Sequence, residues 1–466
     1  MSRINTNIQS LMAVHNLNKA NDDLAQSLAR LSSGLRINTA ADDPSGLIVS
    51  EALRGEKASI AQAIENSTRA GNIVGTAEAA LSEVSALLVG IKDLVTEAAN
   101  SGALSDAELD ANQLAIDSAV SSITRIAKTT RFSGQYLLNG NLAYRTSGVT
   151  ASQLAGVKLY GVEFGGSSNV AVSVAVTTSA QAGTLDIAAS SITEDVTFEV
   201  RGNLGSEVLS FTSSTDTSSI AAAINTFTDA TGVSATVVSA SKISLYSDTF
   251  GSDAFVAVNE VSGSVTGLSG TYDAGQDAAG TINNVTAVGD GLNLSLKTTV
   301  LDLKVTLDDG FGTGTSTFRV TGGGATFQLG SVIDPNGQVR MGIDSVTAGN
   351  LGNGNVGYLS SIVTGGDNSI LDGGAGTAAK ILDTVISDVA SLRGRLGAFV
   401  SNTVQSSVDS LQVALENVTA AESLIRDADF TVEAAGLTRA QVLVNAGTSV
   451  LAIANATPQY ALALLG

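Results

Sequence analysis

The sequence predicts an α+β, multidomain fold in which helices from the two ends of the chain pair around a β-rich central region. Two observations carry this prediction: the placement of glycine and proline, and the spacing of apolar residues. Of 49 glycines, nine lie in residues 1–140, 35 in 141–376 and five in 377–466. The first 131 residues contain no aromatic residue and a single proline, Pro44. Because glycine and proline interrupt helices, both ends are expected to be helical.

Apolar residues at both ends recur in alternating steps of three and four, which is typical of coiled-coil packing. Narrow apolar stripes need partners, so the N-terminal helices are expected to pack against the C-terminal ones. A fully buried Leu or Val contributes roughly 1.5–3 kcal/mol. The N-terminal series are Val14, Leu17, Asn21, Leu24, Leu28, Leu31, Leu35; Val74, Ala77, Leu81, Val84, Leu88, Ile91, Val95; and Leu109, Asn112, Ile116, Ala119, Ile123, Ile126. The C-terminal series are Val404, Val408, Leu411, Leu415, Val418, Glu422, Ile425; and Leu437, Ala440, Val444, Gly447, Leu451, Ala454, Pro458, Ala461, Leu465.

The extreme C-terminal segment differs from the inner helices. Residues 432–466 carry only two charged side chains, Glu433 and Arg439, and are apolar on more than one face. The helix expected around Ile8–Leu35 can cover one face, so the remaining faces predict contacts with other copies of the chain. The predicted polymerisation interface is Ile8, Leu11, Leu17, Leu24, Leu28, Leu31, Leu35, Leu443, Val444, Val450, Leu451, Ile453, Leu462 and Leu465.

A turn is expected where the outermost N-terminal helix ends. Asp42 and Asp43 precede Pro44, and Gly46 follows, a combination that favours a turn and disfavours a helix at Asp43. The two carboxylates are adjacent and diverge, so paired acid–base chemistry is not expected. The segment Arg426–Phe430 is the predicted counterpart on the C-terminal side.

The middle of the chain reads as strands. Apolar and polar residues alternate at 170–176, 196–200 and 301–307. A short helix is expected at 220–225, with further strands after Val233. Asp334-Pro335-Asn336-Gly337 is a turn signal between two apolar segments and predicts a hairpin.

Composition excludes several functional classes. The formal net charge is −20, so neither nucleic acid nor insertion into a membrane is expected. With no cysteine, the chain has no disulfide, thiolate metal site or Cys nucleophile. The first seven residues do not resemble a cleaved signal peptide, and no run approaches the ~18 consecutive apolar residues of a membrane span.

No catalytic, metal or cofactor site is predicted. His15, the only histidine, lies in an amphipathic helix and is expected to be structural or exposed. Gly352–Gly357 fits a G-x-G-x-x-G pattern but lies in a Gly/Asn-rich run, which favours a loop. Asp308–Gly310 lacks calcium-loop spacing, and Asp106, Glu108 and Asp110 fit the acidic start of a helix.

Several segments resemble bacterial flagellins. The resemblance lies in Met1–Asn7, Leu31–Gly46, Thr130–Gly140, Leu437–Leu443 and Ala446–Gln459, and extends over about 1–145 and 326–466. Ile220–Val258 resembles the "IN" repeat of some flagellins and hook-associated proteins. The family implies a secreted filament subunit for motility, exported unfolded through the flagellar type III apparatus, extracellular and not an enzyme.

The resemblance also implies a domain plan and partners. Residues 1–41 and 426–466 would form the inner-tube helical domain, 42–145 and 326–425 the surrounding bundle with a hairpin, and 146–325 the variable outer region. The expected partners are many copies of the same chain, flagellar cap and hook-associated proteins, and an export chaperone at the C-terminal helices.

One departure from the family pattern concerns innate-immune recognition. Stimulatory flagellins have Arg at the position matching Gly90 and Glu at that matching Ala115, in a patch that includes Leu94. Loss of these charge-assisted contacts predicts weak recognition by the Toll-like receptor that detects flagellin. A second departure is the C-terminal end at Leu465-Gly466, where the family often has a basic residue.

Two alternatives remain beside the filament subunit. A hook–filament junction protein would share the terminal helices and the "IN" repeat but would not form long filaments alone. A surface adhesin would use the central β region to contact a host or substratum.

Overall fold

The computed structural model describes residues 6–100, 104–165, 167–187, 192, 194–240, 242–263 and 271–463, with side chains described as far as Thr457. The chain divides into two compact units. One comprises 1–68, 329–333 and 405–466, and the other 69–328 and 334–404. The α-helices are α1 Ile8–Ser33, α2 Pro44–Ala98, α3 Asp106–Thr129, α4 Thr217–Thr226, α5 Thr228–Thr231, α6 Ala375–Ala398, α7 Gln405–Arg426 and α8 Phe430–Ala463.

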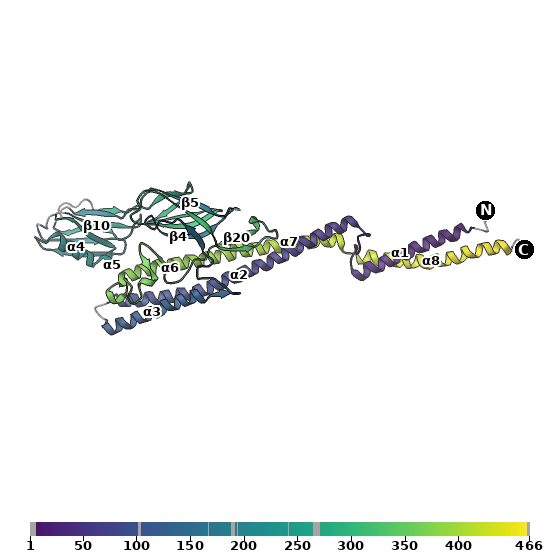
Figure 1. Cartoon of the computed structure of the whole chain (residues 1–466), viewed down its shortest axis with the longest axis horizontal. Coiled ribbons are helices and arrows are strands. Elements are labelled where there is room, and N and C mark those ends of the chain that lie inside the picture. The colour runs from purple at the N-terminus through teal and green to yellow at the C-terminus, as the bar shows by residue number, and fades with distance from the viewer. Residues whose placement is uncertain are drawn as a thin grey trace. The chain divides into compact units, whose positions relative to one another are not determined.

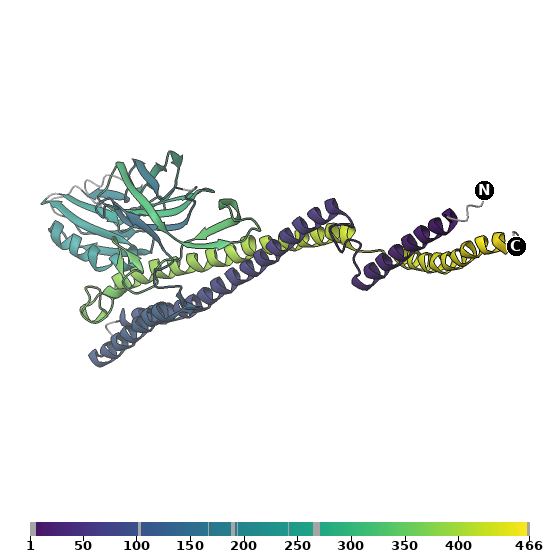
Figure 2. The same cartoon turned by 45° about the vertical axis from the view of Figure 1, so that its right-hand side comes forward.

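The first unit consists mainly of paired helices. α1 lies beside α8, with both termini of the chain at the same end, so the two helices run antiparallel (Figures 1 and 2). The first part of α2 is joined to α7 by ion pairs from Arg54 and Lys57 to Glu422. The prediction that N-terminal helices pair with C-terminal ones is therefore confirmed.

Helix α1 ends earlier than its apolar series predicts. Asn7 caps its start by accepting a hydrogen bond from the Ser10 backbone N–H. At the other end Gly34 takes a left-handed conformation, with φ of +73°, and its N–H donates to the Arg30 carbonyl. Because glycine adopts this conformation readily, Gly34 ends the helix. The prediction that Leu35 continues the helix was wrong.

The predicted breaks between helices are confirmed. Pro44 is the first residue of α2, where its missing N–H costs no helical hydrogen bond. The Gly46 N–H donates to Asp43 Oδ1 at 2.9 Å, so Asp43 caps this helix start. On the C-terminal side α7 ends at Arg426 and α8 begins at Phe430.

The second unit contains a helical bundle with a continuous apolar core. The predicted series from Val74 to Val95 is buried along its whole length. It packs with residues of α3 and α6, including Ile123 and Leu382. Ser105 and Glu108 form a capping box at the start of α3, which confirms the helix-start interpretation of the acidic residues there.

The C-terminal side of the bundle holds a feature that the sequence did not predict. Residues Phe399–Val404 form a π-helical segment between α6 and α7. The periodic series was traced only from Val404, whereas helix α6 already begins at Ala375. The apolar series changes phase at the π-helical segment, so the period that begins at Val404 does not extend back into α6, a helix that the low glycine content after residue 377 does predict.

The central region contains four larger sheets around two cores. A five-stranded sheet, ordered β14-β13-β5-β18-β3, and a four-stranded sheet, β15-β16-β17-β4, supply the residues of the first core. A three-stranded sheet, β6-β10-β9, and a four-stranded sheet, β12-β11-β7-β8, enclose the second core with α4. The strands are β3 Tyr144–Ser147, β4 Leu154–Val162, β5 Val170–Thr178, β6 Thr184–Ile187, β7 Val196–Arg201, β8 Ser206–Phe211, β9 Val233–Ser239, β10 Lys242–Ser247, β11 Phe255–Ser262, β12 Tyr272–Ala274, β13 Ala279–Ile282, β14 Val285–Thr286, β15 Val288–Asp290, β16 Asn293–Lys297, β17 Leu301–Leu307 and β18 Gly314–Gly323.

Small hairpins complete the fold: β1 Arg131–Phe132 with β2 Gln135–Tyr136, β19 Ala325–Gln328 with β20 Gln338–Met341, and β21 Gly352–Asn353 with β22 Gly357–Tyr358. The β19–β20 hairpin confirms the hairpin predicted around Asp334. Asp334 caps the single 3-10 turn Pro335–Gly337 within its loop. The β21–β22 pair corrects the prediction of a loop at Gly352–Gly357. Gly352 and Gly357 have φ of +115° and +113°, and this tight approach suits glycine at both positions.

Candidate assembly surface

The α1–α8 pair is joined by a seam of small residues. Among the described side chains of the two helices, the buried apolar residues are Ala13 and Ala20 in α1 and Ala440 and Ala454 in α8. They lie in a three-and-four alternation with half-buried residues such as Leu17. Small side chains allow two helix backbones to approach closely, but each buries little apolar area.

Two glycines of α8 show how close this approach is. A Cβ added at Gly447 would lie 3.2 Å from Leu17 Cδ1, and one added at Gly436 would lie 3.5 Å from Ser27 Oγ. Polar contacts cross the same seam. Asn7 Nδ2 donates to the Ala454 carbonyl at 2.7 Å, and Arg30 pairs with Glu433 at 3.3 Å.

Several large apolar side chains of both helices point away from the seam. Ile8, Leu11 and Met12 of α1 are 57–64% exposed. In α8 the exposed apolar residues form more than one stripe, as the low charge of this segment predicts. They are Phe430, Val432, Val442, Leu443, Val450 and Ile453.

The predicted interface residues therefore fall into two sets. The outward set is exposed and available to other copies: Ile8, Leu11, Leu28, Leu443, Val450 and Ile453. The inward set is half-buried: Leu17, Leu24, Leu31, Leu35, Val444 and Leu451. Leu462 belongs to α8 but its side chain is outside the described residues, as is the whole of Leu465.

The register predicted for α1 was wrong at three positions. Val14, Asn21 and Leu28 were assigned to the seam but are exposed. Ala13, Ala20 and Ser27, one position earlier in each heptad, lie in or beside the seam instead. The prediction placed residues such as Val14 and Leu28 in the seam, whereas the close approach of the two helices covers the smaller side chains of Ala13 and Ala20. In α8 the predicted positions from Leu437 to Ala454 are the half-buried and buried ones, which confirms that series.

The connection between α1 and α2 is held by backbone pairing and one carboxylate. Leu35 forms an antiparallel bridge with Asp427, and the Arg36 N–H donates to the Arg426 carbonyl at 2.6 Å. Asp42 accepts hydrogen bonds from the backbone N–H groups of Thr39 and Asn38 and from the Gln26 side chain. These bonds, that from the Thr39 backbone first, lower the pKa of Asp42 to about 2.

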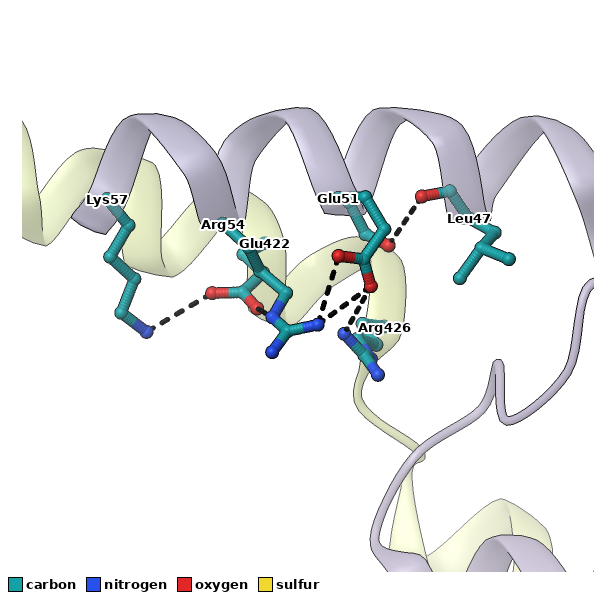
Figure 3. A network of polar contacts seen from close by, with 7 residues as sticks. Leu47, Glu51, Arg54, Lys57, Glu422 and Arg426 are labelled. Carbon is teal, nitrogen blue, oxygen red and sulfur yellow. Dashed lines mark hydrogen bonds and ion pairs between the residues drawn. The ribbon is translucent and has the colours of Figure 1, made fainter. Parts of the chain in front are cut away.

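A charged network joins the first part of α2 to α7 (Figure 3). Glu422 pairs with Lys57 at 3.1 Å and with Arg54 at 3.9 Å. Glu51 pairs with Arg54 at 2.7 Å and with Arg426 at 3.3 Å. Glu422 occupies a position of the predicted apolar series, and these partners explain how a carboxylate is accommodated there. Each pair either combines a partner that is 41–50% exposed with one that is only 15–18% exposed, or lies on one helix, and such partly exposed pairs contribute about 1 kcal/mol or less each.

Two helices in the described part of the chain are long and apolar enough to span a membrane by length and composition. They are α2, with mean hydropathy 1.4, and Phe430–Thr457 of α8, with mean hydropathy 1.2. In α2 the apolar residues from Val74 onward belong to the bundle core. Only 11% of the apolar window in α8 is buried, so its apolar surface needs a partner. The absence of membrane insertion stays a prediction.

The other predicted sites are placed as follows. Gly90 of α2 and Ala115 of α3 are exposed, and Leu94 is half-buried against the bundle core. His15 is exposed, as predicted. Asp308 accepts a hydrogen bond from the Gly310 N–H in a turn. Within the described residues, no group of three His, Cys, Asp or Glu side chains could hold a metal ion.

Comparison with known families gives three matches. Residues 4–143 match the bacterial flagellin N-terminal helical region, and residues 379–465 match the bacterial flagellin C-terminal helical region. Residues 197–249 match the flagellin hook IN motif. The C-terminal match begins at 379, not near 326, and the IN motif begins before the predicted 220–258. Together these matches cover more than half of the chain.

Full-length relatives agree with these matches. The chain is 29% identical to the B-type flagellin of Pseudomonas aeruginosa and 28% identical to polar flagellin F of Vibrio parahaemolyticus, with 99% of each chain covered in both comparisons. It also aligns with the solved structure of FliC from Burkholderia pseudomallei at 15% identity, over 72% of this chain and 99% of that one. The TM-score of 0.25 is too low for that structural likeness to carry an argument.

Proposed function

Since this chain belongs to the bacterial flagellin family, whose members are non-enzymatic structural subunits of the extracellular flagellar filament, we propose that copies join through the outward faces of α1 and α8. The observation that carries this proposal is the distribution of side chains in the pair. The fully buried apolar residues of its seam are alanines, the seam leucines such as Leu17 are only half-buried, and a further set that includes Leu11 and Ile453 stays exposed to water. Exposed apolar stripes of this extent mark interaction surfaces.

Burial of these stripes would contribute favourable free energy to assembly. Six outward residues of the predicted interface are exposed by about half or more. Full burial of a Leu, Ile or Val side chain is worth roughly 1.5–3 kcal/mol, so covering the exposed half of each yields about half of that per residue. Repeated at every copy of a polymer, this gain offsets the entropy lost on association.

The same surface would need protection before assembly. We propose that the chain leaves the cell unfolded through the type III apparatus, with an export chaperone covering the C-terminal helices. Flagellar cap and hook-associated proteins are proposed to contact the same terminal helices at the ends of the filament. The absence of cysteine is compatible with this route, since no disulfide has to be reduced before export.

The proposal is tested by seeded polymerisation followed by negative-stain microscopy. One variant is truncated before Ala434, which removes most of α8. A second carries Leu443→Ser, Val450→Ser and Ile453→Ser, which leave the small-residue seam intact. Both are expected to stay monomeric under conditions in which the intact chain forms long filaments.

A matched control changes polar residues of the same helix: Gln441→Ala, Asn445→Ala and Ser449→Ala, all exposed. This control should polymerise like the intact chain. Normal filaments from the serine variant would contradict the proposed interface. An intact chain that stayed monomeric with seeds would favour the junction-protein alternative.

A further inference from the structure

The outer face of one sheet in the central region carries an ordered set of side chains that filament formation does not explain. The sheet is β12-β11-β7-β8, and its inner face supplies Phe198, Val200, Val256 and Val258 to the second β core. Strand residues alternate between faces, so the neighbours of these core residues point outward. The antiparallel register aligns the outward residues in rows across the strands.

An aromatic pair lies at one end of this face. Tyr272 of β12 stacks on Phe255 of β11 with ring centroids 5.5 Å apart and an interplanar angle of 29°. The Arg201 guanidinium of β7 lies 6.0 Å from the Phe255 ring centroid. Ala257 lies directly opposite Tyr272 in the register and is only 8% exposed. At 60%, Tyr272 is the most exposed tyrosine among those whose side chains are described.

The next two rows are mainly polar, with the exposed Val208 of β8 opposite Glu199. Asn259 Nδ2 donates to Glu199 Oε2 at 3.2 Å, and hydrogen bonds from Ser206 and Asn259 lower the pKa of Glu199. Beyond them the Thr197 and Ser210 hydroxyls are 2.9 Å apart. The aromatic row and the hydroxyl row are four residues apart along the strands, about 13 Å, which matches a short oligosaccharide.

The charge of this face indicates what it can bind. Its outward positions in the four strands hold one cation, Arg201, and one anion, Glu199, so the face is locally neutral in a chain of net charge −20. A neutral face neither attracts a polyanion nor repels an uncharged ligand. Sugar rings present C–H groups on one side and hydroxyls at the edge. The C–H groups suit the negative face of an aromatic ring, and the hydroxyls suit adjacent amide and carboxylate groups.

We propose that this face, formed by Tyr272, Phe255, Arg201, Asn259 and Glu199, is a binding site for neutral oligosaccharides. The Tyr272–Phe255 pair is the stacking platform for one sugar ring. Asn259 and Glu199 take hydroxyl or N-acetyl groups of the next. This activity would add adhesion to glycan-coated surfaces to the structural role of the filament, and it does not depend on which helices join the copies.

The test uses the full chain as a monomer, with cellotetraose, chitotetraose and maltotetraose as probes in calorimetry and saturation-transfer NMR. A tetragalacturonate and an extended Ser/Thr-rich peptide are included as alternative ligands. We expect at least one neutral tetrasaccharide to bind. Tyr272→Ala should weaken that binding about tenfold or more, because it removes the exposed ring. Tyr272→Phe, which keeps the ring, should bind within about twofold of the unmodified chain.

Tyr246→Ala is the matched control, since Tyr246 is a partly exposed tyrosine of β10 in a different sheet. It should leave binding unchanged, and circular dichroism should show both alanine variants folded. Loss of hydrogen-bonding groups in Asn259→Ala should also weaken binding. The proposal is overturned if no neutral tetrasaccharide binds, if Tyr272→Ala binds as well as the unmodified chain, or if only the acidic sugar or the peptide binds.

Discussion

The helical bundle and the terminal helix pair share one sequence period but bury different residues. In the bundle the seam residues are large and completely covered, as with Leu81, Leu88 and Ile91 at 0% exposure. In the α1–α8 pair the buried apolar residues are alanines, at 4–6% exposure. The leucines of the seam, such as Leu17, are only half-buried, and other large side chains, such as Leu11, face outward.

This difference shows that an apolar period alone does not decide whether two helices bury their large apolar side chains within one chain. A seam of Leu, Val and Ile removes enough apolar area from water to stabilise the bundle within one chain. A seam whose buried residues are small brings the backbones together but leaves large apolar side chains, such as Leu11 and Ile453, exposed. We expect the second arrangement to gain stability when further helices cover the outward stripes, as the proposed filament interface would do.

The largest expected effect is in the bundle. Leu88→Ala removes a fully buried side chain from the core and should destabilise the monomer by about 2–5 kcal/mol. Leu443→Ala in α8 changes a side chain that is 49% exposed and should change the stability of the monomer by less than about 0.5 kcal/mol. Denaturant unfolding of the two monomers measures both values. Equal losses would remove the distinction between the two regions.

A smaller effect is expected in the terminal seam. Gly447→Leu places a side chain against Leu17 and should destabilise the α1–α8 pair by about 1–3 kcal/mol. Gly436→Ala is the control, because its Cβ would meet Ser27 Oγ at an ordinary 3.5 Å and alanine favours the helix by about 1 kcal/mol. Far-UV circular dichroism during heating should show earlier helix loss for the first variant and later loss for the second. A fully stable Gly447→Leu pair would contradict the close-packed seam.

The connection after α1 should respond to pH. The pKa of Asp42 is lowered from 3.8 to about 2, so its stabilising effect is complete above pH 3.8 and is lost as the pH falls toward 2. Asp42→Asn should therefore lower the melting temperature at pH 5, and the difference from the unmodified chain should shrink as the pH falls through 2. Thermal melts across this range measure the difference. A difference that stayed constant with pH would exclude the carboxylate as the cause.

Substitutions on the surface of the bundle are expected to have the smallest effect on the structure. Gly90 is exposed and a Cβ there meets nothing within 4 Å, and Ala115 is exposed on α3. Gly90→Arg with Ala115→Glu should leave the fold intact and raise the response of cells bearing the Toll-like receptor for flagellin, by restoring charge-assisted contacts. The unmodified chain is expected to be weak in the same assay. A strong response to the unmodified chain at nanomolar doses would refute the prediction.

Much of the fold could be predicted from sequence because its signals are local or strictly periodic. The bundle seam from Val74 to Val95 combines large apolar residues with an unbroken period, and Asp43-Pro44 marks a helix start by its own chemistry. The strands at 170–176 and 301–307 alternate clearly and are confirmed by β5 and β17.

The predictions were wrong where several residues follow the same period and only tertiary packing decides which of them are buried. In α1, Val14, Asn21 and Leu28 follow the same period as Ala13, Ala20 and Ser27, and only the close approach of α8 decides which set is covered. The π-helical segment Phe399–Val404 shifts the phase of the series, and no local residue type marks it. The aromatic face at Tyr272 depends on pairing between strands that are distant in sequence.

The most direct test of the account is hydrogen–deuterium exchange of the monomer and of the assembled filament, compared peptide by peptide. We expect amides of α1 and α8 to exchange quickly in the monomer and to become strongly protected in the filament, since their apolar faces are covered only there. Amides of α3, α6 and the α2 segment from Val74 to Val95 should be protected equally in both states. Terminal helices already as protected in the monomer as the bundle would contradict the claim that the α1–α8 pair is completed by other copies.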